Sequence, residues 1–285
     1  MEPILKVENL SKKYDGFALK NISFNLPKGS IMGLVGENGA GKTTTIKLIL
    51  NLIKKDGGNI NIFNLDNIED EQKIKENIGV VFDNSYFHDN LMPKDISKIM
   101  NNIYSNWEDD IFLDYLRIFK LPKYKVVKEF SKGMKMKLSI AVALSHNPQL
   151  LILDEPTSGL DPIVRSEILD IFLDYIQDEE KSILFSTHIT SDLDKIADYI
   201  TFIHDGEIIL SESKEELISN YGIIKCGKND FQRIAKEDII GYRKNQFSYE
   251  VLLKDKSKNS IKYKDFIIDS ANLEDIMLFY IRSEK

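Results

Sequence analysis

The sequence has little cysteine, no long apolar run and no excess of basic residues. Its single cysteine, Cys226, excludes an internal disulfide framework and suits a reducing compartment. No apolar run approaches the ~18 residues of a membrane helix, and residues 1–6 lack the layout of a signal peptide. The formal charge of −7 argues against a nucleic-acid partner, because phosphate neutralisation needs a basic face. We therefore expect a protein that is soluble or is held at a membrane only through a partner.

The chain does contain enough apolar material for a full core, 42% of its 285 residues. Short apolar runs typical of buried strands alternate with segments of helical spacing. The expected strands lie at residues 4–10, 21–26, 30–35, 57–63, 78–82, 150–153, 182–186 and 199–203. This alternation predicts an α/β fold with a parallel sheet. The helical pattern at about residues 84–147 indicates a helical subdomain inserted into it.

The pattern changes after residue 218. Turn-rich stretches occur at residues 220–222 and 226–229, and apolar residues alternate at residues 247–251 and 260–264. We interpret the interleaved Lys and Tyr there as amphipathic strands, with a nucleic-acid face as the alternative. A last helix is expected to begin at Asn272. We therefore expect a large domain over residues 1–218 and a small α+β domain over residues 219–285.

Residues 36–44 fit the pattern of a phosphate-binding P-loop, between an expected strand and a helix at residues 44–50. Glycines let successive N–H groups face one point, and the helix adds the positive end of its dipole. Lys42 is expected to reach the β- and γ-phosphates, and the Thr43 hydroxyl to bind Mg²⁺. The expected nucleotide-binding residues of this loop are Gly36, Glu37, Asn38, Gly39, Ala40, Gly41, Lys42, Thr43 and Thr44.

Asp154 and Glu155 directly follow the apolar run at residues 150–153. A buried strand there would place both carboxylates at its carboxyl end, where ligands bind in open α/β sheets. Asp154 would hold Mg²⁺ directly or through water, and Glu155 would accept the proton of an attacking water or orient it. Alternatively, both are solvated acids at a strand end. The P-loop favours the first interpretation.

At this point the order of motifs resembles the ATP-binding subunit of an ABC transporter, over roughly residues 2–218. Residues 130–134, Phe-Ser-Lys-Gly-Met, lie where the family has its Leu-Ser-Gly-Gly-Gln signature. Residues 154–161 are similar to a Walker B motif that runs into the D-loop, and residues 186–188, Ser-Thr-His, are similar to the switch-histidine loop. Tyr14 matches the aromatic position before the P-loop. The resemblance implies a P-loop NTPase core of the RecA-like type.

The resemblance also implies roles for single residues. Tyr14 would stack on adenine, and Ser131 and Gly133 would face the γ-phosphate of ATP bound to a second subunit. His188 would contact the γ-phosphate and complete a catalytic set with Glu155 and Lys42. The protein would then act as a homodimer or as a heterodimer with a paralogous ATPase, with Asp161 at the interface.

Two features depart from the family pattern. Asp83 stands where the family has its Q-loop glutamine; a carboxylate can still approach Mg²⁺ through water, so Asp83 joins Thr43 and Asp154 as an expected metal ligand. In the signature, Lys132 and Met134 replace a glycine and the glutamine, while the residues expected to contact phosphate are kept.

We therefore expect an ABC-2 type exporter ATPase that uses ATP and Mg²⁺ to power a separate integral membrane permease. It would be cytoplasmic and held at the inner face of the cell membrane by that permease. Tyr86, Phe87, Leu91 and Met92 would form an apolar groove for the permease, with ordinary packing as the alternative. The alternative function, suggested by Asp83 and by the altered signature, is a soluble nucleotide-sensing ABC protein with weak hydrolysis.

Overall fold

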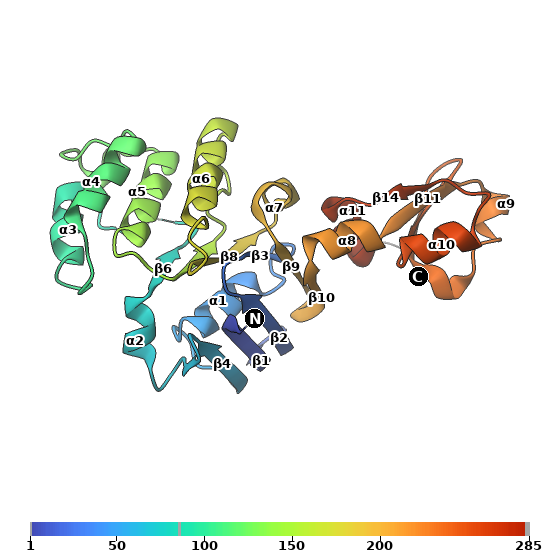
Figure 1. Cartoon of the computed structure of the whole chain (residues 1–285), viewed down its shortest axis with the longest axis horizontal. Helices are drawn as coiled ribbons and strands as arrows, with labels where there is room; N and C mark the ends of the chain where they lie inside the picture. Colours follow the sequence, from blue (N-terminus) through green and yellow to red (C-terminus); the bar gives the residue numbers. More distant parts are fainter. Residues whose placement is uncertain (1, 85–86, 283–285) are drawn as a thin grey trace. The chain divides into compact units, whose positions relative to one another are not determined.

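The computed structural model describes residues 2–84 and 87–282 (Figure 1). The chain divides into two compact units between Leu210 and Ser211, slightly before the boundary expected after residue 218. Tyr86, one residue of the expected apolar groove, lies outside the described residues. Within the described ranges, no helix has both the length and the apolar character to cross a bilayer.

The first unit contains most of the strands and helices of the chain. In chain order they are β1 (Pro3–Tyr14), β2 (Phe17–Pro27), β3 (Ile31–Val35), α1 (Lys42–Ile49), β4 (Gly57–Ile62), β5 (Leu65–Asp66), α2 (Glu71–Glu76), β6 (Ile78–Val81), α3 (Pro93–Met100), α4 (Asp109–Ile118), η1 (Val127–Glu129), α5 (Lys132–Leu144), β7 (Leu150–Asp154), α6 (Pro162–Tyr175), β8 (Ser182–Thr187), α7 (Thr190–Ile196), β9 (Tyr199–His204) and β10 (Glu207–Ser213), whose last residues pass into the second unit.

A sheet of six strands positions the site, in the order β10-β9-β3-β8-β7-β6. Strand β3 is parallel to β8 and β9, and β7 is parallel to β8 and β6. Every residue of β3, β7 and β8 is buried, as expected for strands covered on both faces. The register pairs Val35 with Thr187 and Asp154 with Ser186. The segments that follow these three strands therefore start at the same edge of the sheet.

A second sheet in this unit has the order β2-β1-β4-β5 and is antiparallel. Val7 of β1 lies opposite Phe24 of β2 and Ile60 of β4, and all three are buried. The sequence predicted strands in these places but not their separation into a sheet of their own. One-sided burial explains the alternating pattern of β2 and β4.

Helices α3, α4 and α5 are inserted between β6 and β7, and Figure 1 shows them grouped together. Both α3 and α4 contact α5. Helix α5 begins after Ser131, whose hydroxyl accepts a hydrogen bond from the Met134 N–H at 3.2 Å. The predicted fold class, an α/β P-loop core with an inserted helical subdomain and a small α+β appendage, is confirmed.

The second unit is built on a four-stranded antiparallel sheet in the order β12-β13-β11-β14. Its elements after β10 are α8 (Lys214–Asn220), β11 (Gly222–Cys226), α9 (Lys228–Phe231), η2 (Lys236–Asp238), β12 (Ile239–Lys244), β13 (Tyr249–Leu253), α10 (Lys256–Lys262), β14 (Ile268–Ser270) and α11 (Leu273–Arg282). The helix expected to begin at Asn272 and the strand at residues 247–251 lie within one or two residues of α11 and β13.

The strand expected at residues 260–264 is wrong, because α10 occupies most of this segment. The two apolar residues that suggested a strand do not share one environment: Ile261 is 71% exposed, whereas Tyr263 is buried. Asn259 anchors the helix, and its side-chain amide donates to the Lys254 carbonyl. Two apolar residues two positions apart are too few to distinguish a strand from a surface helix.

His146 is a buried titratable group in the segment between α5 and β7. Its Nε2 lies 3.1 Å from the Ile78 carbonyl oxygen, and its ring stacks on Tyr104 with 3.9 Å between the ring centroids. The side chain is almost fully buried, and burial lowers its pKa below the usual 6.5. The folded protein therefore holds this imidazole neutral under conditions in which the unfolded chain would protonate it.

We predict that this histidine makes the fold sensitive to mild acid. Below pH 6.5 the unfolded chain binds a proton at His146 that the folded chain excludes, so stability falls as the pH falls, by at most about 1.4 kcal/mol per pH unit from this group. Urea unfolding of the wild type and of His146→Gln at pH 7.5 and 5.5 measures this effect. The variant should lose less stability between the two pH values, and an equal loss would contradict the prediction.

Candidate functional site

The loop between β3 and α1 requires glycine at two positions for different reasons. Gly41 precedes α1 with a φ of 116°, a conformation that L side chains rarely adopt. At Gly36 a Cβ atom would lie 2.3 Å from the carbonyl oxygen of Ile203, so any side chain would push the loop away from β9. These two constraints hold the loop over the carboxyl end of β3, with α1 starting directly behind it.

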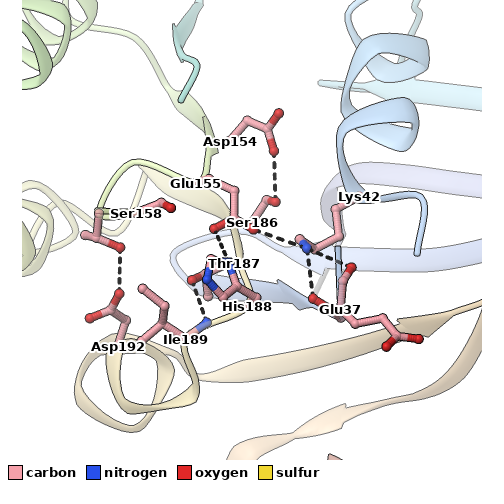
Figure 2. Close-up of polar contacts among 12 residues, drawn as sticks. Glu37, Lys42, Asp154, Glu155, Ser158, Ser186, Thr187, His188, Ile189 and Asp192 are labelled. Atoms are coloured by element: carbon pink, nitrogen blue, oxygen red, sulfur yellow. Dashed lines mark hydrogen bonds and ion pairs between the residues drawn. The ribbon is translucent and has the colours of Figure 1, made fainter. Parts of the chain in front are cut away.

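Lys42 is buried at the first position of α1, and its ammonium group lies among three oxygens. Its Nζ is 2.8 Å from the Gly36 carbonyl oxygen, 3.2 Å from the Glu37 carbonyl oxygen and 3.1 Å from Oε1 of Glu155 (Figure 2). Two of its three N–H donors are thus hydrogen-bonded to backbone carbonyls, and Glu155 is an ion-pair partner. The P-loop and the end of β7, more than 100 residues apart in the chain, therefore meet at this one cation.

Asp154, the last residue of β7, is buried and hydrogen-bonded to two hydroxyl groups. Ser186 Oγ donates to its Oδ1 at 3.0 Å, and Thr43 is a second hydrogen-bond partner. Burial raises the pKa of this carboxyl; the two hydroxyls oppose that shift, and the charges of Glu155 and Asp83 add to it. A cation placed beside this carboxylate would favour its ionised form.

Glu155 has a backbone conformation that is unusual for a residue other than glycine, with a φ of 53°. Its N–H donates to the Ser186 carbonyl at 3.0 Å, and its Oε2 lies 2.7 Å from Nδ1 of His188 (Figure 2). The Glu155 side chain is mostly buried, whereas that of His188 is 40% exposed. One carboxylate thus bridges Lys42 and the histidine that follows β8.

Lys42, Glu155 and His188 line one cavity of about 640 Å³. Many of the residues expected to bind nucleotide or metal line it: Asn38, Gly39, Gly41, Lys42, Thr43, Thr44, Asp83, Glu155 and His188. Gly36, Glu37, Ala40 and Asp154 lie in the same loop and strand end without lining it. Asp83, at the Q-loop position, accepts a hydrogen bond from the Asn84 amide at 3.0 Å. Because Asp83 lines the cavity, this departure from the family pattern introduces a carboxylate into it.

Three further residues line this cavity and were not expected to do so: Phe17, Lys132 and Ser158. Phe17 pairs with Tyr14 across the β1–β2 hairpin, and its ring lies near Gly41. Tyr14 itself is 43% exposed, does not line the cavity, and has Lys12 Nζ 5.5 Å from its ring centroid. Of the two aromatic residues paired in this hairpin, only Phe17 lines the cavity, and the two-residue turn between them was the signal in the sequence that could have identified it.

Ser131 and Gly133 do not line the cavity, but Lys132 between them does. Lys132 Nζ donates to the Ser158 carbonyl at 2.7 Å, which connects the signature segment to the loop after Glu155. At Gly133 a Cβ atom would lie 3.2 Å from Val164 of α6. Sequence reasoning identified Lys132 only as a departure from the family pattern, because its partner is a backbone carbonyl that no motif reveals.

Comparison with known proteins agrees with this geometry. The profile of the family described as ABC transporter matches residues 19–158. The lantibiotic transport ATP-binding protein SrtF of Streptococcus pyogenes is 38% identical over 226 residues, which cover 76% of this chain and 96% of SrtF. The bacitracin transport ATP-binding protein BcrA of Bacillus licheniformis is 36% identical over 212 residues, which cover 73% of this chain and 69% of BcrA.

Two solved structures extend the comparison to the fold. One, of an ATP-binding subunit of an ABC transporter, aligns with a TM-score of 0.69 and 26% identity over 75% of this chain and 91% of its own. The other, cbiO1 from Clostridium perfringens, aligns with a TM-score of 0.65 and 29% identity over 75% of this chain and 89% of its own. Family and fold agree: the chain belongs to the ABC transporter family, as one of its ATP-binding, ATP-hydrolysing transport proteins.

Proposed function

We propose that the chain binds MgATP and hydrolyses it to power export by a separate integral membrane permease. The observation that carries this proposal is the convergence of Lys42, Glu155 and His188 on one cavity next to the P-loop. SrtF and BcrA are described as lantibiotic and bacitracin transport proteins, which supports export of a compound of that kind. The protein would be cytoplasmic and held at the inner face of the membrane through the permease.

The residues around Asp154 fit a magnesium ion. The Thr43 hydroxyl and the Asp154 carboxylate already contact each other, and Asp83 lines the same cavity. Hydroxyl and carboxylate oxygens, completed by water and phosphate oxygens, are the ligands that Mg²⁺ prefers. When bound, the ion would neutralise charge on the transferring phosphoryl group.

The residues of the chain would then have separate roles in ATP hydrolysis. Lys42 and the N–H groups of the P-loop bind the phosphates and stabilise charge that develops on them. Glu155 accepts a proton from the attacking water or orients it, and His188, its hydrogen-bond partner, contacts the γ-phosphate. Tyr14 and Phe17 offer aromatic surface to the adenine base.

A second ATPase subunit would complete the site. Ser131 and Gly133 at the start of α5, together with Asp161 at the start of α6, would face nucleotide bound to a second copy or to a paralogue. Asp161 caps α6 in this chain, because its Oδ1 accepts from the N–H groups of Ile163 and Val164 at 3.1 and 3.0 Å. Closing and reopening of this dimer would drive the permease.

We predict that Glu155→Gln lowers kcat for ATP hydrolysis by about 100-fold or more, because an amide cannot accept the proton of water. Nucleotide affinity should be no weaker, since the P-loop is untouched and Lys42 loses a competing carboxylate. Phosphate release and the binding of a fluorescent ATP analogue measure the two effects separately. Turnover equal to that of the wild type would remove Glu155 from the mechanism.

Lys42→Ala should give the opposite pattern. It removes the cation that we expect to contact the β- and γ-phosphates, and a hydrogen bond to a charged group contributes about 1.5–3 kcal/mol. Nucleotide affinity should therefore fall by roughly 10- to 100-fold in the same binding assay. Unchanged affinity in a folded Lys42→Ala protein would contradict the assignment of the phosphate site.

Asp83→Asn tests the carboxylate at the Q-loop position. Removing one negative charge near a bound cation costs about 1 kcal/mol at short range, so half-maximal ATPase activity should need roughly fivefold more Mg²⁺. The matched control is Asp110→Asn at the exposed start of α4, which should leave the Mg²⁺ dependence unchanged. The same dependence in both variants would exclude Asp83 from the metal site.

The permease is tested by purifying the chain from detergent-solubilised membranes of its native cells. We expect one integral membrane protein in stoichiometric amount, because transport needs a membrane-spanning path that no described helix of this chain supplies. Recovery of the chain alone, from the soluble fraction only, would count against the transporter assignment.

A further inference from the structure

A buried carboxylate, Asp192 of α7, connects the loop after His188 to the loop after Glu155. Its side chain is 1% exposed, and both of its oxygens have partners. Thr157 Oγ1 donates to Oδ2 at 2.6 Å, and Arg165 of α6 forms an ion pair with Oδ1. Asp192 lies in the first turn of α7, four residues after His188 (Figure 2). None of these three residues lines the cavity.

The ion pair explains how a charge is retained at this buried position. Burying a carboxylate is costly unless the group is paired, and here the Arg165 guanidinium and a second hydrogen bond offset that cost. Arg165 is itself oriented, because its Nη2 donates to Ser191 Oγ at 2.6 Å. An ionised Asp192 accepts only, so the Thr157 hydroxyl must donate to it, and the direction of this hydrogen bond is defined.

The connection matters because Glu155 has a strained backbone two residues before Thr157. A positive φ costs a non-glycine residue about 1–2 kcal/mol, and such residues persist only where their surroundings enforce them. On one side Glu155 is held by the hydrogen bond of its N–H to Ser186. On the other side, the Thr157–Asp192 hydrogen bond holds the loop as it leaves Glu155. The strained residue is thus fixed from both directions.

The same bond also sets the spacing of the Glu155–His188 pair. Asp192 lies four residues after His188, and Thr157 lies two residues after Glu155, so the loops are joined twice. One contact is the 2.7 Å pair between Glu155 and His188. The other is the 2.6 Å hydrogen bond between Thr157 and Asp192. Two contacts define the relative position of two loops better than one contact between mobile side chains.

We propose that Asp192, through Thr157 and with Arg165 as its counter-ion, is a positioning residue that holds Glu155 in its catalytic conformation. This inference rests on the proposed role of Glu155 in hydrolysis. Without the bond, the loop relaxes towards an ordinary φ and the Glu155 carboxylate turns away from His188. The P-loop is held by other contacts, so nucleotide binding does not depend on Asp192.

Thr157→Val is the most selective test, because it removes the hydroxyl and keeps the shape of the side chain. We expect kcat to fall by about 10- to 100-fold, the effect of a misplaced catalytic group, with KM for ATP unchanged within a factor of two to three. The melting temperature is recorded alongside, and kcat is measured well below it. A purely structural role would lower the melting temperature and leave kcat of the folded protein unchanged.

The matched control is Thr201→Val on β9. Thr201 is equally buried, and its hydroxyl donates to Met32 Sδ at 3.3 Å, away from the loops that carry Glu155 and His188. This variant should keep the kcat of the wild type. An equal loss of kcat in both variants would show that removal of any buried hydroxyl disturbs the enzyme, and would overturn the proposal.

A double-mutant cycle tests whether Thr157 acts through Asp192. Asp192→Asn should also lower kcat, and the double variant with Thr157→Val should be no slower than Asp192→Asn alone, because both changes remove one contact. Additive losses would mean that Thr157 acts elsewhere, and wild-type kcat in folded Thr157→Val would overturn the inference. Failure of the proposed function is distinct: the wild-type protein would then show no hydrolysis that depends on Glu155.

Discussion

The parallel register of β3, β7 and β8 is the constraint on which the site depends. Because the three strands run in the same direction and pair without offset, the P-loop, Glu155 and His188 all emerge at one edge of the sheet. The strands are buried on both faces, so apolar side chains on each side of the sheet hold them in place. Hydrophobic burial therefore also determines the geometry of the polar groups.

Charge is concentrated at this edge and compensated locally. Lys42 and Arg165 each contact a carboxylate, Glu155 and Asp192 respectively, and these contacts join segments that are far apart in the sequence. Asp154 is hydrogen-bonded to two hydroxyl groups, and burial raises the pKa of its carboxyl. The Lys42–Glu155 and Arg165–Asp192 pairs thus connect separate segments of the chain, whereas the Asp154 carboxylate is suited to binding a ligand.

The sequence predicted what local patterns can encode. The strands of the parallel sheet, the P-loop and the acidic pair at residues 154–155 follow from short contiguous patterns. The antiparallel sheet of β1, β2 and β4 was not predicted, because the sequence of a single segment does not determine which strand it pairs with. For the same reason the Lys132–Ser158 and Thr157–Asp192 contacts were missed: each joins residues whose separation in the chain gives no signal. The strand predicted at residues 260–264 failed because its pattern was too short.

The contacts of Lys42 have a consequence for the state of the loop before any ligand arrives. Two of the three N–H donors of this ammonium group are hydrogen-bonded to the Gly36 and Glu37 carbonyl oxygens, whereas Oε1 of Glu155, at 3.1 Å, is an ion-pair partner without a hydrogen bond. An anion could therefore bind to Lys42 without displacing either backbone carbonyl. The loop's own backbone thus holds the cation in place in advance, which is preorganisation by the chain itself.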